Sequence, residues 1–331
     1  MKSRPKKESL TVAFCMDPIE DMNLETDTTF IIMLEAQKRG HKILYFTPEL
    51  MEVEQGRPVA VMSEAMVKWP TKKAPDHYSL SKTKKTGLAD TDLIFMRVDP
   101  PYDLDYVTAL HILAMVQPPT LVVNRPGGLL LANEKMLALR FPELMPPTIV
   151  SRRPDKLLSF LEEVGGKMVL KPLPGFGGEG VVVVEKNHTN RKALVQMMTE
   201  NGKQLVQAQK FLPVNRQGDK RIIMLSGGPI GAVTRMPAKG DHRANLHSGG
   251  SYKKAWLTEK DREICKTVGA LLKREGLWIA GLDVVAGYLT EINVTSPTLL
   301  RQINELEGVK LEENILDFCE YLCRAARQSA G

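Results

Sequence analysis

A glycine-rich run, LKPLPGFGGEGVVVVE at 170–185, is the stretch whose residue types most clearly indicate chemistry. It contains the spacing G-x-G-x-x-G at Gly175, Gly177 and Gly180, but a dinucleotide-binding fingerprint needs a helix after the loop. The valines that follow predict a strand instead. A glycine loop between antiparallel strands can fold over a triphosphate and offer it backbone N–H groups, and Lys171 would add a positive charge there. A flexible hairpin tip with an exposed lysine is the alternative.

A second cluster forms if residues 277–293 fold as a β-hairpin. With the turn centred on Gly287, Asp283 lies opposite Glu291, and Asn293 lies two residues beyond on the same face. Oxygen-bearing side chains without histidine or thiol suit Mg²⁺ or Mn²⁺, with phosphate oxygens completing the coordination. A two-residue turn would shift the register and move Asp283 to a diagonal position. The alternative is an exposed polar sheet face, although the hairpin is otherwise apolar and lone carboxylates are seldom buried in such surroundings.

Several cations occur at predicted strand ends or in the polar segment 237–250, namely Lys135, Lys171, Arg221, Arg235 and Arg243. Each alone is typical of a surface residue, but phosphoryl transfer depends mainly on positioning and charge neutralisation, so several cations around a triphosphate are expected. The sequence has no G-x-S-x-G or H-E-x-x-H motif and no evident Cys–His pair, which disfavours covalent hydrolase chemistry. The residues therefore predict an ATP- and Mg²⁺-dependent enzyme without a protein nucleophile.

The elements that must position these residues change in kind near residue 133. Before it, apolar runs at 10–16, 42–46, 92–97 and 120–124 alternate with helical patterns, which predicts an α/β domain with a parallel sheet. After it, short apolar runs pair as hairpins, with helices expected at 190–200, 258–274 and 310–327. This half is predicted to be α+β with antiparallel sheets, and 237–250 is predicted to be a long lid-like loop.

Composition indicates an ordinary globular chain of 331 residues, 43% hydrophobic and 25% charged. No run approaches the length of a membrane-spanning helix, and the basic start lacks a secretory cleavage pattern, so a cytoplasmic protein without membrane segments is expected. The net charge of +6 comes from residues 1–9 and 68–85, and each of these segments is predicted to be a solvated surface segment. Nucleic acid is therefore not an expected partner.

Several strings resemble the ATP-grasp superfamily and, within it, the bacterial glutathione synthetases. They follow one another along nearly the whole chain: MDP at 16–18, LEAQKRG at 34–40, MR and DPPYD within 96–103, NEK at 133–135, LKPLPGFGG at 170–178, GDKR at 218–221, GLDVV at 281–285 and LTEINVTSPT at 289–298. The resemblance implies an N-terminal substrate-binding domain at 1–132 and a two-part ATP-grasp fold. Its central lid subdomain would span 133–205, and its C-terminal catalytic subdomain would span 206–331.

The same resemblance implies a role for each site residue. ATP would be held by the phosphate ligands Lys135 and Lys171, the covering loop Gly175, Gly177 and Gly178, the adenine pocket Gln209, Lys210, Phe211 and Leu212, and the ribose ligand Asp219. Arg221 would stabilise the developing tetrahedral charge, while Arg235 and Arg243 would bracket the lid. Asp283, Glu291 and Asn293 would hold two Mg²⁺ or Mn²⁺ ions. Asp17, Arg97, Asp99 and Ser296 would help shape the dipeptide site.

The implied activity is ATP-dependent joining of γ-glutamylcysteine and glycine to glutathione through an acyl phosphate, by a homo-oligomer of four subunits. Another ATP-grasp ligase, joining a carboxylate to a different amino acid or peptide tail, would share the ATP and metal residues. A non-catalytic nucleotide- or nucleic-acid-binding protein is the alternative from another class. The chain also departs from the family pattern at Val98, where a lysine is expected, and this leaves the substrate-carboxylate contacts there open.

Overall fold

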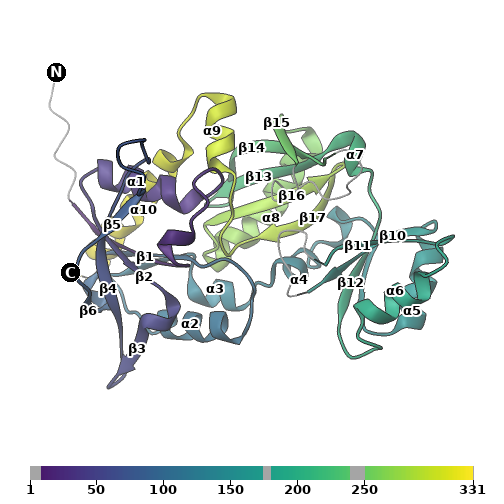
Figure 1. Ribbon diagram of the computed structural model, residues 1–331, viewed down its shortest axis with the longest axis horizontal. Helices are drawn as coiled ribbons and strands as arrows, with labels where there is room; N and C mark the ends of the chain where they lie inside the picture. Colours follow the sequence, from purple (N-terminus) through teal and green to yellow (C-terminus); the bar gives the residue numbers. More distant parts are fainter. Residues whose placement is uncertain (1–8, 174–179, 239–249, 331) are drawn as a thin grey trace.

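The computed structural model describes residues 9–173, 180–238 and 250–330. Three sheets follow one another along the long axis of the molecule (Figure 1). The first is built from the N-terminal third of the chain, the second from the C-terminal part, and the third from the residues between them. The α/β and α+β fold class predicted from the sequence is confirmed.

The N-terminal sheet has a parallel centre. Its strands lie in the order β2 (Lys42–Phe46), β1 (Thr11–Met16), β7 (Leu93–Arg97) and β8 (Leu121–Val123). One face packs against α2 (Leu104–Ala114) and α3 (Pro126–Leu130), and the other against α1 (Thr28–Lys38) and α10 (Leu311–Ala330). Since both faces are covered, the strands consist of continuous apolar runs, which is why the sequence predicted them.

An antiparallel extension of this sheet was not predicted. Strand β4 (Arg57–Val67) pairs with β2 and also with β3 (Met51–Glu54), β5 (Tyr78–Leu80) and β6 (Lys84–Gly87). The prediction that 68–85 is a solvated loop is therefore wrong at its C-terminal end, where two short edge strands form. Most of their side chains are exposed, and backbone pairing with β4, rather than side-chain burial, sets their position.

The four-stranded sheet has a core of its own. Its strands β9 (Thr148–Ser151), β10 (Lys167–Pro172), β11 (Val182–Glu185) and β12 (Val206–Lys210) are antiparallel in the order β11-β10-β12-β9. One face packs against α5 (Pro154–Glu163) and α6 (Arg191–Met198), which lie together at one end of the molecule (Figure 1). The boundary placed at 205/206 from the sequence falls inside this sheet, because β12 lies between β10 and β9.

The C-terminal sheet is antiparallel in the order β15-β14-β13-β16-β17. Its strands are β13 (Asp219–Leu225), β14 (Gly228–Met236), β15 (Ser251–Lys254), β16 (Ile279–Val285) and β17 (Tyr288–Asn293). Helix α8 (Glu259–Glu275) covers one face, and α9 (Leu300–Glu307) with α10 covers part of the other. Helix α8 lies so close to the β13–β14 turn that a Cβ on Gly269 would meet the carbonyl oxygen of Gly227 at 2.0 Å. Two short helices, α4 (Glu134–Ala138) and α7 (Val214–Gln217), precede the strands of the site.

Within the ranges that the structure describes, no helix is both long enough and apolar enough to cross a membrane.

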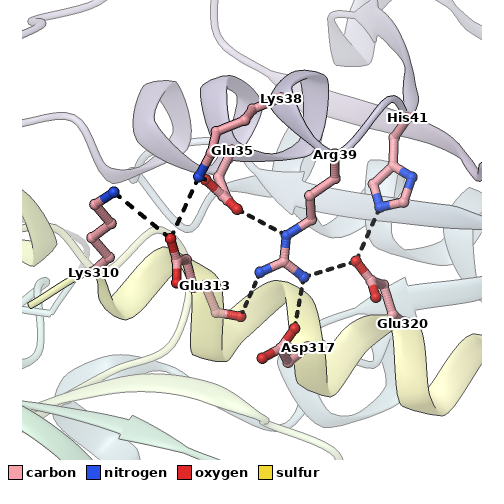
Figure 2. Close-up of polar contacts among 8 residues, drawn as sticks. All are labelled: Glu35, Lys38, Arg39, His41, Lys310, Glu313, Asp317 and Glu320. Atoms are coloured by element: carbon pink, nitrogen blue, oxygen red, sulfur yellow. Dashed lines mark hydrogen bonds and ion pairs between the residues drawn. The ribbon is translucent and has the colours of Figure 1, made fainter. Parts of the chain in front are cut away.

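A charged cluster joins α1 to α10 (Figure 2). The guanidinium of Arg39 lies 2.9 Å from Glu35, 2.7 Å from Asp317 and 2.8 Å from Glu320. It also donates to the Glu313 carbonyl at 3.1 Å. The Arg39 side chain is only 11% exposed, and those of Glu35 and Glu320 are 8% and 5% exposed. The cluster therefore ties the C-terminal helix to the first helix of the N-terminal domain through buried charges.

Replacing Arg39 by methionine is expected to lower the free energy of unfolding by about 3 kcal/mol, because it removes the guanidinium that contacts the buried carboxylates of Glu35 and Glu320. Urea unfolding measures this change. The matched control is Lys38→Met, which removes a cation that contacts the same Glu35 but is 60% exposed, and it is expected to lower the free energy of unfolding far less than Arg39→Met. Equal losses in the two variants would contradict the buried role of Arg39.

A pH dependence follows from Glu35. Burial alone would raise the pKa of its carboxyl, but hydrogen bonds from Lys38 and Arg39 outweigh burial, and the pKa lies below its usual value. A lowered folded-state pKa contributes stability above the unfolded-state value of about 4.3, and this contribution is lost as the pH falls through the folded-state pKa. The difference in unfolding free energy between the parent and Glu35→Gln is therefore expected to shrink between about pH 5 and pH 3. A difference that stays constant over this range would contradict it.

Candidate active site

Charged side chains occupy one face of the C-terminal sheet, opposite α8. Asp219 pairs with Arg235, Arg221 pairs with Asp283, and Asp283 pairs with Glu291 across neighbouring strands. Directly paired residues share a face, and so do residues two apart on one strand. The alternating pattern of four strands thus brings acids and arginines from distant parts of the sequence into one cluster.

Asp283 is at the centre of this cluster and is only 4% exposed. Its carboxylate accepts hydrogen bonds from Arg221 Nε at 2.5 Å and Nη2 at 3.0 Å, and from the Asn293 amide at 3.2 Å. Arg235 Nη2 lies 2.9 Å from the same carboxylate. Burial alone would raise the pKa of Asp283, but the two guanidinium groups outweigh it and hold the pKa well below its usual range. The carboxylate is therefore ionised at neutral pH.

The hairpin that carries the three predicted metal ligands, Asp283, Glu291 and Asn293, has the predicted pairing for an unexpected reason. Its turn consists of two residues, Ala286 and Gly287, both at positive φ, so Val285 pairs with Tyr288 and Val284 with Leu289. A bulge at Thr290 then shifts the register by one residue and restores Asp283 opposite Glu291, with Asn293 opposite Gly281. The predicted juxtaposition is confirmed, although the turn alone would have moved Asp283 to a diagonal position.

Two lysines from separate elements approach this cluster. Asn133 caps α4 by accepting from the backbone N–H groups of Lys135 and Met136, which fixes the helical turn that carries Lys135. Lys135 Nζ lies 3.5 Å from Glu291 Oε1. Lys171, at the end of β10, is half-buried; desolvation lowers its pKa, and the charge of Glu291 is the largest opposing influence. Both lysines therefore place positive charge beside the same carboxylate.

The predicted adenine pocket lies on the four-stranded sheet and just beyond it. Gln209 and Lys210 end β12, and the Phe211 ring lies under the Lys167 ammonium at 4.2 Å, with Leu212 next in the chain. Gln207 and Gln209 share the face of Lys171, away from α5 and α6. The sheet thus directs polar side chains from β10 and β12 outward from its own core.

Three buried polar atoms of this region have no hydrogen-bond partner among the described residues: Gln207 Oε1, Asp219 Oδ1 and Arg235 Nε. Unpaired buried polar atoms are costly, so such a group indicates a place where a ligand completes the hydrogen bonding. Burial raises the pKa of Asp219 to about 6, against the opposing effect of Arg235. Among the described residues, the acceptor Asp219 Oδ1 and the donor Arg235 Nε are therefore available to a ligand beside the cluster.

The residues predicted for the dipeptide also lie together. The Asp99 backbone N–H donates to Asp17 Oδ2 at 2.8 Å, and the nearby Ser296 hydroxyl opposes the effect of burial, which raises the pKa of the Asp99 carboxyl. Arg97 is buried, donates to Thr29 Oγ1 at 3.0 Å and to the Pro297 carbonyl at 3.2 Å, and burial lowers its pKa. The ends of β1 and β7 thus meet the loop after β17. Val98, where the family pattern has lysine, packs against the apolar core.

Four predicted residues lie outside the described ranges: Gly175, Gly177, Gly178 and Arg243.

Two family models match this chain in succession. The N-terminal domain of prokaryotic glutathione synthetase matches residues 10–129, and its ATP-grasp domain matches residues 134–308. The chain belongs to the prokaryotic glutathione synthetase family. Family membership implies that ATP is used and that a divalent metal is required.

Relatives and solved structures agree with this assignment. The glutathione synthetase of Brucella melitensis is 39% identical over 313 residues, covering 94% of this chain and 99% of the relative. That of Bradyrhizobium diazoefficiens is 42% identical over 311 residues, covering 94% and 98%. The solved ATP-grasp ligase PsnB has a TM-score of 0.62 at 16% identity, covering 96% of this chain and 100% of PsnB, and it shows the same fold.

Glu134 was not singled out from the sequence of this family member, although it stands in the NEK string. Its carboxylate lies beside the loop after β17 and accepts from Thr295 Oγ1 at 2.8 Å. Burial, with the nearby charge of Glu291, raises the pKa of Glu134 to about 7. The one available signal was its position next to a predicted phosphate lysine.

Gly281 leaves space for the Arg221 side chain. A Cβ at residue 281 would lie 2.9 Å from Arg221 Cδ and 3.2 Å from its Nε. Since Asp283 holds the far end of that arginine, Gly281→Ala is expected to displace the guanidinium and lower kcat by about 10-fold or more. The matched control is Gly127→Ala, where an added Cβ meets nothing within 4 Å, and it should keep the parent kcat. Steady-state kinetics with both variants, after a check of Tm, provides the measurement. Parent-like turnover in Gly281→Ala would contradict the tight placement of Arg221.

Proposed function

We propose that this chain joins the cysteinyl carboxylate of γ-glutamylcysteine to the amine of glycine, converting ATP to ADP and phosphate and giving glutathione. The observation that carries this proposal is the match of both domains of prokaryotic glutathione synthetase to one chain, together with a cation-rich cluster that the fold builds where the two ATP-grasp sheets meet. The relatives that bear this name are covered almost completely, so the proposal concerns the whole activity.

The reaction has two steps. The dipeptide carboxylate oxygen attacks the γ-phosphorus of ATP and ADP leaves, which forms an acyl phosphate. The glycine amine then attacks the acyl carbon and loses a proton, and inorganic phosphate leaves with its bonding pair. An acyl phosphate hydrolyses in water, so the site must be closed while it exists. We assign closure to the glycine loop with Gly175, Gly177 and Gly178, and to the segment that contains Arg243.

The phosphates of ATP are the ligand that best fits Lys135 and Lys171, because both ammonium groups approach the cluster from different elements. The free acceptor Asp219 Oδ1 suits a ribose hydroxyl, and the segment Gln209, Lys210, Phe211 and Leu212 suits the adenine. Arg221, held by Asp283, would face the tetrahedral oxygen that develops when the amine attacks. Arg235, whose Nε is unpartnered, is placed to join it.

The donor set of Asp283, Glu291 and Asn293 fits a hard divalent cation, because it offers carboxylate and amide oxygens on adjacent positions of one sheet face. We propose that these three residues hold two Mg²⁺ or Mn²⁺ ions together with the ATP phosphates. The metal would neutralise negative charge on the phosphoryl group while that group is transferred. Arg221 and Arg235 both contact the Asp283 carboxylate in this structure. A metal ion can therefore bind Asp283 only if the two arginines share the carboxylate with it.

Asp17, Arg97, Asp99 and Ser296 are proposed to hold the dipeptide, which carries both carboxylate and ammonium groups. A buried arginine beside acidic residues offers a partner for each charge. We further propose that the enzyme works in the cytoplasm as a homo-oligomer, a tetramer by family resemblance, without a nucleic-acid partner. Its four cysteines are buried and unpaired, as in a reducing compartment.

A coupled assay of ADP release tests the proposal, with ATP, Mg²⁺, γ-glutamylcysteine and glycine each omitted in turn. We expect turnover only when all four are present, with glutathione identified by mass spectrometry. Turnover with a different amine or carboxylate in place of these substrates would assign another ATP-grasp ligase activity. No turnover with any pair, from folded protein, would contradict an enzymatic function.

Arg221→Ala is expected to lower kcat by about 10²-fold, as for the loss of an oxyanion-stabilising donor. Arg221→Lys keeps the charge but not the two-pronged contact with Asp283, and an intermediate kcat is expected. The matched control is Arg274→Ala, because Arg274 is 65% exposed and distant from the cluster. Thermal unfolding of each variant separates a folding defect from a catalytic one. A kcat within twofold of the parent in folded Arg221→Ala would remove Arg221 from the mechanism.

A further inference from the structure

The loop that follows β17 connects two parts of the proposed site. Asn293, the last residue of β17, is one of the proposed metal ligands, and Ser296, three residues on, lies beside Asp99 in the proposed dipeptide site. Only Val294 and Thr295 separate them, and these residues are 0% and 3% exposed. Neither lies in a strand, so the sheet does not fix their backbone. The position of the proposed metal site relative to the proposed dipeptide site therefore depends on what holds Val294 and Thr295 in place.

Glu134 holds the N–H side of the segment. Its Oε1 accepts hydrogen bonds from the backbone N–H groups of Val294 at 3.2 Å and Thr295 at 3.4 Å, and from Thr295 Oγ1 at 2.8 Å. Glu134 is the first residue of α4, next to Lys135. One carboxylate thus connects the helical turn that carries the phosphate lysine to the loop between the metal and dipeptide residues.

Asn124 holds the carbonyl side. Its Nδ2 donates to the Val294 carbonyl at 2.9 Å and to the Ile279 carbonyl at 2.7 Å, while its Oδ1 accepts from the Ile279 N–H at 2.8 Å. Asn124 directly follows β8 of the N-terminal sheet and is 4% exposed. Both backbone polar groups of Val294 are therefore bonded to side chains from outside its own sheet.

We propose that Glu134 and Asn124 are positioning residues, which together set where the Asn293 amide and the Ser296 hydroxyl lie relative to Lys135. This inference rests on the proposed function. Stability alone does not account for Glu134, because a carboxylate buried near the like charge of Glu291 costs free energy that an apolar residue would not. Hydrogen bonds that hold the groups behind a metal ligand orient that ligand. Their removal lowers metal affinity or activity by about 10- to 100-fold.

The test uses two substitutions of Glu134 that remove the same charge. Glu134→Gln keeps a carbonyl oxygen that can accept from Val294 and Thr295, whereas Glu134→Ala keeps none. Mn²⁺ binding in the presence of ADP, followed by electron paramagnetic resonance, is the readout that does not require turnover. We expect Mn²⁺ to bind Glu134→Ala about 10- to 100-fold more weakly than the parent, and Glu134→Gln to recover most of the loss. The KM for γ-glutamylcysteine should rise in the same order.

Thr295→Val provides a milder variant, since it removes one of three hydrogen bonds without changing the shape of the side chain, and Thr295→Ser restores the hydroxyl. The matched control is Asn304→Ala. Asn304 also uses its side chain to bond a backbone N–H, that of Leu311 at 2.9 Å, but it joins α9 to α10 rather than two parts of the proposed site. This control should lower Tm and leave Mn²⁺ binding and KM at parent values.

Equal Mn²⁺ affinities for Glu134→Gln and Glu134→Ala would overturn the proposal, because charge rather than positioning would then explain the effect. So would parent-like Mn²⁺ affinities combined with a lowered Tm, as in the control. If the parent makes no glutathione but the ordered loss of Mn²⁺ affinity persists, the positioning role stands and the substrates must be reassigned. A parent that binds no Mn²⁺ with ADP contradicts both proposals.

Discussion

The carboxylate of Asp283, held between two guanidinium groups, is the interaction on which the rest of the site depends. A buried charge is tolerated only beside an opposite one, and Asp283 obtains its partners from β13 and β14 while β17 supplies an amide. This requirement decides which side of each of the strands β13, β14, β16 and β17 carries the charged residues. It therefore also places Asp219 and Glu291 on that face of the sheet. Helix α8 can then cover the other face with mainly apolar contacts, together with the ion pair between Lys220 and Asp261.

The acids of the cluster also have cations beside them before any ligand arrives, because arginines and lysines from four elements, β13, β14, α4 and β10, surround them. A metal–nucleotide complex carries both positive and negative charge. When it binds such a cluster, the metal can pair with the acids and the phosphates with the lysines and arginines. The two sheets contribute differently to this arrangement. The C-terminal sheet supplies fixed, mutually paired groups, whereas Lys171 belongs to a sheet whose apolar core is shared only with α5 and α6.

Local sequence patterns and the family resemblance predicted much of the fold and of the site. The features that they missed depend on contacts between residues far apart in the sequence, or on a bulge that restores the strand register. The parallel strands were predictable because both faces are apolar, whereas β4 is half exposed and pairs with strands that have few buried residues. The pairing of Asp283 with Glu291 was predicted, but the bulge at Thr290 that preserves it left no sequence signal. Glu134 contacts Thr295 across 161 residues of chain, a separation that local periodicity does not register. The glycine loop and Arg243 lie outside the described ranges, so their predicted roles remain predictions.

The packing of α10 has a consequence for how the protein is made. Ile315, Leu316, Cys319 and Cys323 of this helix complete the core that contains Phe14 and Ile32, and Arg39 fastens the two helices together. The part of this sheet face that α1 does not cover therefore stays uncovered during translation until residues 311–330 have left the ribosome. Domains generally fold as they emerge, but this one needs a piece that arrives some 190 residues after its last central strand, β8, ends at Val123. In the interval the nascent chain exposes part of an apolar sheet face, which is a surface prone to aggregation.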